Sequence, residues 1–147
     1  LDGQAIFYAG PTPASPAHPT RPFGAVGPTT ASRMDAFAPR LYAAGVRATI
    51  GKGTRSEAVA RACAATGSVY FTAVGGAAAL LGSRVERAET VAFEDLGTEA
   101  LRRIHVVDFP VTVAIDAQGR TRADMAAEAA AQVEKSAGSL TEGEVSQ

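Results

Sequence analysis

Short β-prone runs alternate with helical segments along most of the chain, and this alternation constrains the fold more than any other feature of the sequence. The runs QAIFY (residues 4–8), VRATI (46–50) and SVYFTAV (68–74) are rich in the β-branched and aromatic side chains that favour strands. Segments with helical apolar spacing separate them. This order predicts an α/β domain in which a layered sheet carries flanking helices.

The later part of the chain departs from simple alternation. Three strand-like runs, residues 88–93, 104–109 and 111–116, follow one another there, with a short helix expected near residues 97–103. Strands without long helical connections between them are compatible with antiparallel pairing, which leaves a mixed sheet open as an alternative. An alanine-rich helix is predicted at residues 122–135.

One helical segment contains an internal proline that allows two interpretations. Residues 29–45 show apolar side chains at helical spacing, but Pro39 interrupts them. Proline inside a helix removes a backbone hydrogen bond and clashes with the preceding turn. Either the helix kinks there, or a short turn beginning near Thr29 precedes a second helix that Asp35 caps.

Two other boundaries are predicted from turn and cap residues. Prolines and glycines crowd residues 10–28, which we expect to form a loop without regular structure. Thr54 and Glu57 have the spacing of a capping box, which predicts the start of a helix that ends at Gly67.

The composition excludes several classes of protein. At 147 residues, 46% hydrophobic and 20% charged, the chain is suited to one globular domain, which we assign to residues 1–135, with 136–147 as a disordered tail. A net charge of −1 and the lack of a basic run argue against nucleic-acid binding. No apolar run approaches the ~20 residues of a membrane helix.

The single cysteine, Cys63, limits both disulfide and metal chemistry. It cannot form an internal disulfide, and alone it cannot hold an iron–sulfur cluster or a structural zinc ion. We expect it to be a small core residue on the apolar face of its helix, in a cytoplasmic protein. No residue of the sequence has metal-ligand spacing, so no metal site is predicted on this chain.

The sequence GVRATIGKG has the look of a phosphate-binding loop but lacks its spacing. Five residues, rather than the four of a phosphate-binding loop, separate the first glycine from the Gly-Lys pair. Glycine also follows the lysine, at the position where serine or threonine would hold magnesium. A strand that runs through Gly51, Lys52 and Gly53 into a helix still presents backbone N–H groups beside a cation, which suits an anion. The alternative is a tight turn with a solvated lysine.

A second candidate anion site lies in the sequence GPTTASRMD. Residues four apart share one face of a helix, so we expect Arg33 to lie near Thr29, with Thr30 beside them. Arginine and a helix start both favour a carboxylate. The alternative is a threonine N-cap with a surface arginine. Together with Lys52, this set would suit a small ligand with two negative charges.

Five stretches in this order resemble a known family. GPTTASRMD, IGKGTRS, VYFTAVGGAAALL, EDLGTEALRRI and VVDFPVTVAIDAQG are similar to the β, or C-terminal, component of the iron–sulfur-dependent hydro-lyases, which include class I fumarase and L-tartrate dehydratase. The resemblance covers about residues 3 to 120. Its most specific part is GPTT-x-x-RMD followed about twenty residues later by GKG.

The resemblance implies a swivelling β/β/α domain and a hydro-lyase reaction. Members reversibly hydrate a C4 dicarboxylate, with fumarate and L-malate as the commonest pair and L-tartrate next, which would place the reaction in the tricarboxylic acid cycle. A [4Fe-4S] cluster is held by the partner α component, and dimers of αβ units are expected. By motif position Thr29 would be the catalytic base, while Arg33 and Lys52, with Thr30, Gly51 and Gly53, would bind substrate.

The sequence departs from the family pattern in one respect. Members carry an Arg-Asp-Ala-x-His-like stretch ahead of GPTT, whose arginine also grips substrate, and we expect this domain to lack that N-terminal segment. The competing interpretation is therefore a non-catalytic dicarboxylate-binding or regulatory module derived from the same domain. A neighbouring reading frame with widely spaced cysteines would favour the enzyme.

Overall fold

The structure is a computed structural model that describes residues 1–142, with side chains described through residue 133. Its centre is a four-stranded sheet in the order β1-β4-β5-β8. The three strands β1, β4 and β5 are parallel, and β8 is antiparallel to β5. The bounds of these strands are Ala5–Phe7 (β1), Ala48–Gly51 (β4), Val69–Thr72 (β5) and Thr112–Ile115 (β8). The strands predicted at residues 4–8, 46–50, 68–74 and 111–116 are thus confirmed, and of the sheet types left open the mixed one is found.

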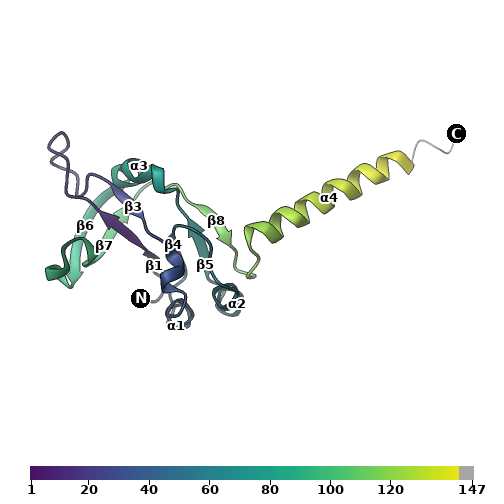
Figure 1. The fold of residues 1–147 in the computed structure, drawn as a ribbon, viewed down its shortest axis with the longest axis horizontal. Helices are drawn as coiled ribbons and strands as arrows, with labels where there is room; N and C mark the ends of the chain where they lie inside the picture. The colour runs from purple at the N-terminus through teal and green to yellow at the C-terminus, as the bar shows by residue number, and fades with distance from the viewer. Residues whose placement is uncertain (143–147) are drawn as a thin grey trace.

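Two helices connect the parallel strands. Helices α1 (Ala38–Ala43) and α2 (Glu57–Thr66) lie together beneath the sheet (Figure 1). Helix α2 ends at Gly67, which has a left-handed φ of 67° as a C-cap glycine requires. The main core fills the space between these helices and the sheet, and its largest fully buried members include Tyr70, Val46 and Val59.

Two small antiparallel sheets complete the layered α/β architecture. Strands β2 (Ala9–Pro11) and β3 (Val26–Pro28) form one pair, and β6 (Val85–Ala92) and β7 (Leu101–Val106) form the other. The β6–β7 hairpin lies on the side of β1 away from α4 (Figure 1). Four short helices lie between these strands, namely η1 (Ala31–Met34), η2 (Gly75–Ala77), α3 (Ala78–Ser83) and η3 (Glu94–Glu99).

The structure decides between the two interpretations of the Pro39 segment. A short 3-10 helix, η1, is followed by the separate helix α1, so the helix does not kink at Pro39. The N-cap of α1 is Phe37, and Pro39 lies in its first turn, where the missing N–H costs nothing. Asp35 is not the cap that was expected, because its carboxylate bonds to another segment.

Three other predicted boundaries are wrong. The ends of the proline-rich region 10–28 pair as β2 and β3. Thr54 and Glu57 form no capping box, since α2 starts after Ser56 and makes no side-chain cap bond. The short helix expected at residues 97–103 lies earlier, as η3, and its last residues belong to β7.

The C-terminal helix stands apart from the rest of the molecule. Helix α4 (Arg122–Glu142) projects away from β8 (Figure 1) and continues beyond its predicted end at Lys135. Residues 143–147 of the predicted tail lie outside the described residues. Among the helices that the structure describes, none combines the length and the apolar character that crossing a bilayer demands.

Candidate functional site

The two sequence motifs meet at the carboxyl ends of the parallel strands. We call residues 27–35 the threonine segment and residues 51–56 the lysine segment. Thr29 N–H donates to Tyr8 O at 2.8 Å, and Lys52 N–H donates to Thr29 O at 2.9 Å. Open α/β sheets bind ligands at this end of their strands. The backbone therefore brings both predicted anion-binding motifs to the usual ligand position.

Thr30 and Lys52 extend this junction. The two residues form an isolated parallel bridge, and Ala31 N–H donates to Lys52 O at 2.9 Å. Thr30 occupies the N-cap position of η1, but its side chain makes no cap bond, so its exposed hydroxyl is not used by the helix.

Arg33 lies against Thr29, as their spacing predicts. The Arg33 Nη2 group donates a hydrogen bond to Thr29 Oγ1. Arg33 is exposed and Thr29 is half-buried. A guanidinium that bonds a hydroxyl oxygen favours the negatively charged form of that oxygen. The contact therefore joins a cationic group and a hydroxyl group at this site.

Gly51 is required by the packing at this junction. It is buried, and an added Cβ would lie 2.8 Å from Ala31 Cβ and 3.3 Å from Thr29 O. Any side chain there would separate the lysine segment from the threonine segment. Gly53 has a φ of 88°, which glycine adopts without strain, and its carbonyl accepts a 2.8 Å hydrogen bond from Tyr70 Oη.

The exposed Lys52 side chain runs across the end of the neighbouring strand. A Cβ added at Gly75, just after β5, would lie 3.4 Å from Lys52 Cδ and 4.0 Å from Lys52 Nζ. The ammonium group thus lies over the ends of β4 and β5, where a dissolved anion can reach it.

A buried ion pair beneath the site was not predicted as such from the sequence. Arg55 Nε donates to Asp35 Oδ1 at 2.5 Å, and Ser56 N–H donates to Asp35 Oδ2 at 2.7 Å. Burial alone would raise the pKa of Asp35, but the bonds from Arg55 and Ser56 outweigh it and lower that pKa below the ordinary value. The partners are twenty positions apart, so spacing gave no signal of their contact.

The residues of this chain do not fit an iron–sulfur cluster. Cys63, the only cysteine, is fully buried in the core, and burial raises the pKa of its thiol, which disfavours the thiolate that a metal needs. Among residues 1–142, His, Cys, Asp and Glu form no group of three that could hold a metal ion. The expectation that Cys63 is a core residue is confirmed.

A groove separates the site-bearing sheet from the hairpin. It has a volume of about 800 Å³ and runs between β1 and β7. Apolar side chains from both walls line it, among them Ile6, Phe7, Leu101 and Ile104. No sequence motif indicates this groove, because its walls come from segments about one hundred residues apart.

Comparison with known proteins identifies the family. The sequence profile described as Fumarase C-terminus matches residues 1–124. The chain belongs to this family. The resemblance seen in the sequence motifs is thereby confirmed, and with it the kinship to class I fumarate hydratases and to tartrate dehydratase β subunits.

The matches to two fumarate hydratases cover most of this chain but only a small part of each relative. The chain is 39% identical over 116 residues to an anaerobic class I fumarate hydratase of Escherichia coli (strain K12), and 37% identical to the mitochondrial fumarate hydratase 1 of Leishmania major. Each match covers 78% of this chain but 21% of the relative, so the chain spans about a fifth of those enzymes.

A shorter relative is named as a separate subunit. A Methanocaldococcus jannaschii protein provisionally named L(+)-tartrate dehydratase subunit beta is 33% identical over 125 residues. The match covers 82% of this chain and 64% of that protein. Family members therefore occur both within long fumarate hydratases and as a chain whose name refers to a subunit.

Proposed function

We propose that this chain is the substrate-binding β component of a hydro-lyase that reversibly hydrates a C4 dicarboxylate. Fumarate to L-malate is the first choice, and L-tartrate dehydration is the second. Family membership supports the reaction class, because the relatives named above are fumarate hydratases and a tartrate dehydratase subunit.

The observation that carries the proposal is the joining of the two motifs at one sheet edge. The bridge between Thr30 and Lys52 joins the two segments, and the threonine segment also carries the cationic Arg33. A dicarboxylate has two negative groups to neutralise, and arginine can hold one of them in a bidentate manner. Two exposed cations on a rigid backbone junction are suited to that ligand.

Thr29 is the proposed base at the substrate carbon. Removing a proton next to a carboxylate builds negative charge on that carboxylate, and fixed cations stabilise the charge most where it develops. An ordinary threonine hydroxyl is a weak base, and the hydrogen bond from Arg33 Nη2 supplies the stabilisation that its alkoxide form needs.

The proposal requires a second component. The buried Cys63 cannot hold the [4Fe-4S] cluster expected for this reaction, so we assign the cluster to an α component that meets this chain at the site. When bound, such a cluster supplies a Lewis acid for the departing hydroxyl. We further propose a cytoplasmic dimer of αβ units, in which residues 1–135 form the β domain and an N-terminal segment completes it.

Reconstitution tests the function. The purified chain is mixed with an iron-loaded α component, and fumarate absorbance is followed. We expect hydration that falls about 10²-fold or more in kcat/KM with Thr29→Ala, Arg33→Ala or Lys52→Ala, because each removes a group that acts on the transition state.

Arg61→Ala is the matched control. Arg61 is exposed on α2 and pairs with Glu57 one helical turn away, so its loss should leave the rate unchanged. Full activity in all three site variants, with the fold intact, would show that the substrate binds elsewhere.

A further inference from the structure

We propose that the buried Asp35–Arg55 ion pair is a positioning device that sets the spacing between Arg33 and Lys52. It links the threonine segment to the lysine segment from below, while the backbone bridge links them at the surface. This inference rests on the proposed function, since it concerns the site that would bind the dicarboxylate.

The pair is placed where a small shift would reach both cations. Asp35 comes two residues after Arg33, at the end of η1, and Arg55 comes three residues after Lys52. Both carboxylate oxygens of Asp35 accept hydrogen bonds from the lysine segment, one from Arg55 Nε and the other from Ser56 N–H. Two bonds in fixed directions fix orientation as well as distance.

The surroundings hold the guanidinium of Arg55 rigidly. Its side chain has no exposed surface, and its Nη1 donates to Thr49 Oγ1 at 3.3 Å. The guanidinium carbon lies 4.8 Å from the ring centroid of Tyr70 and 5.6 Å from that of Tyr8. Tyr70 Oη also donates a hydrogen bond to Gly53 O. Tyr70 therefore contacts the lysine segment at two residues, Arg55 through its ring and Gly53 through its hydroxyl.

The arrangement is costly for a purely structural contact. Arg55 Nη2 is buried without a hydrogen-bond partner among the described residues. Well-packed apolar side chains often stabilise a core as well as a buried ion pair does. A directional pair that leaves one buried N–H group unsatisfied is better explained by the geometry that it imposes on Arg33 and Lys52.

The test compares a two-point ligand with a one-point ligand. Succinate and acetate, neither of which reacts, are titrated into the 147-residue chain and followed by NMR. Asp35→Asn keeps the size of the side chain but removes its charge. We expect succinate affinity to fall at least about 10-fold and acetate affinity to change far less, since misplacing two groups by even 1 Å is costly.

The ratio of the two affinities separates positioning from folding. A variant that merely unfolds part of the sample lowers both affinities by the same factor and leaves the ratio unchanged. Asp35→Leu combined with Arg55→Met provides a second test, because paired apolar replacement of a buried ion pair usually keeps the fold. We expect this double variant to be folded and to show the same fall in the ratio.

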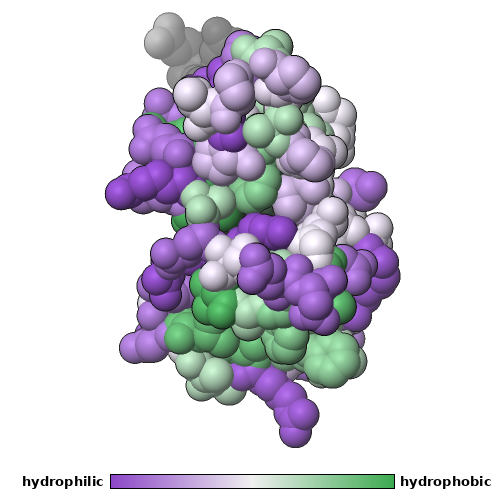
Figure 2. Space-filling model, turned by 90° about the vertical axis from the view of Figure 1, so that its left-hand side faces the viewer, coloured by the Kyte–Doolittle hydropathy of each residue, from purple (hydrophilic) through white to green (hydrophobic). Residues whose placement is uncertain are grey.

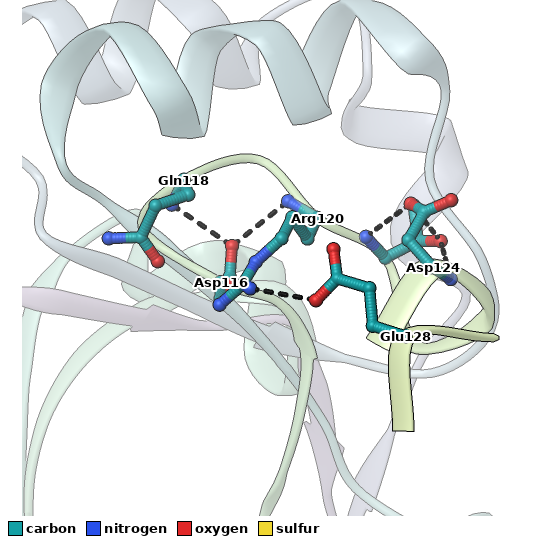
Figure 3. A network of polar contacts seen from close by, with 6 residues as sticks. Asp116, Gln118, Arg120, Asp124 and Glu128 are labelled. Carbon is teal, nitrogen blue, oxygen red and sulfur yellow. Dashed lines mark hydrogen bonds and ion pairs between the residues drawn. The ribbon is translucent and has the colours of Figure 1, made fainter. Parts of the chain in front are cut away.

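The chain offers a matched control at the opposite end of the sheet. Asp116, directly after β8, accepts bonds from Arg120 Nε and from the N–H groups of Gln118 and Arg120 (Figure 3). Asp116→Asn therefore removes a comparable arginine-paired carboxylate without touching the two motifs. It should leave the succinate-to-acetate ratio unchanged.

The outcomes distinguish this inference from the proposed function. If the wild-type chain binds no succinate, both the proposed site and the positioning role are wrong. If the wild type binds succinate and both Asp35 variants keep the ratio, the positioning role is wrong while the proposed function stands. A fall in both Asp35 variants, but not with Asp116→Asn, supports the proposal.

Discussion

The half of the molecule built on β1, β4 and β5 largely buries the ion pair beneath the site, whereas the ion pairs of the β6–β7 hairpin are exposed. Beneath the site, the Arg55 side chain is fully buried and that of Asp35 is 17% exposed. On the hairpin, Arg103 pairs with Glu89, but these side chains are 74% and 60% exposed. The same chemistry of ion pairing therefore operates in two different dielectric environments.

The apolar side chains show the same contrast. Those around Tyr70 and Val59 are buried between sheet and helices, whereas Phe93, Leu96 and Leu101 on the hairpin side are each more than half exposed. Figure 2, which views the molecule from the hairpin side, shows apolar surface gathered in the lower half of that face. The comparison indicates that the ion pair beneath the site lies in a more desolvated environment than the ion pairs of the hairpin.

The largest expected effect comes from breaking the buried ion pair. Asp35→Asn should lower the free energy of unfolding by about 3 kcal/mol, because it leaves the Arg55 charge buried without a counter-charge. Glu89→Gln, the matched change on the hairpin, should stay within about 0.5 kcal/mol, as exposed pairs do. Urea unfolding measures both. Equal effects would mean that the two halves do not differ.

A second prediction concerns the glycine at the motif junction. Gly51→Ala should cost about 2 kcal/mol, because its methyl group would overlap Ala31 and press on Tyr8 in a packed region. Gly76→Ala is the control, since nothing lies within 4 Å of its added Cβ. Thermal melting compares the two variants. A Gly51→Ala protein as stable as wild type would show that the junction can open.

The smallest predicted effect is a dependence on pH. The pKa of Asp35 is lower in the folded chain than its ordinary value of 3.8, so the unfolded chain binds this proton more readily. The stability gained is complete above the ordinary pKa and is lost as pH falls through the folded one. Unfolding free energies from pH 6 to 2 should fall less steeply in Asp35→Asn than in wild type. Parallel curves would contradict this.

The sequence predicted those parts of the fold that depend on local preference. The β-branched runs became β1, β4 and β5, and Gly67 ended its helix in the left-handed conformation. The prediction that residues 10–28 lack regular structure was wrong at both ends of this region. Pro11 and Pro28 lie in a two-stranded ribbon, and proline is tolerated on edge strands.

The contacts of the site could be predicted where both residues belong to one sequence motif. Contacts between distant segments could not be predicted. Thr29 and Arg33 could be paired from their spacing, and the structure joins them. Asp35 was expected to cap α1, yet its carboxylate accepts the Ser56 N–H just before α2 and pairs with Arg55. This contact joins segments twenty positions apart, so no local pattern of residues indicates it.

The clustering of tyrosines around Arg55 gives this protein a built-in optical reporter. The chain contains no tryptophan and three tyrosines, Tyr8, Tyr42 and Tyr70, which are 8%, 2% and 0% exposed. Two of the rings flank the guanidinium, and Tyr42 Oη lies 2.5 Å from Thr49 Oγ1, which accepts a bond from Arg55. The tyrosine signals in near-ultraviolet circular dichroism and fluorescence therefore report on the surroundings of Arg55 without any label.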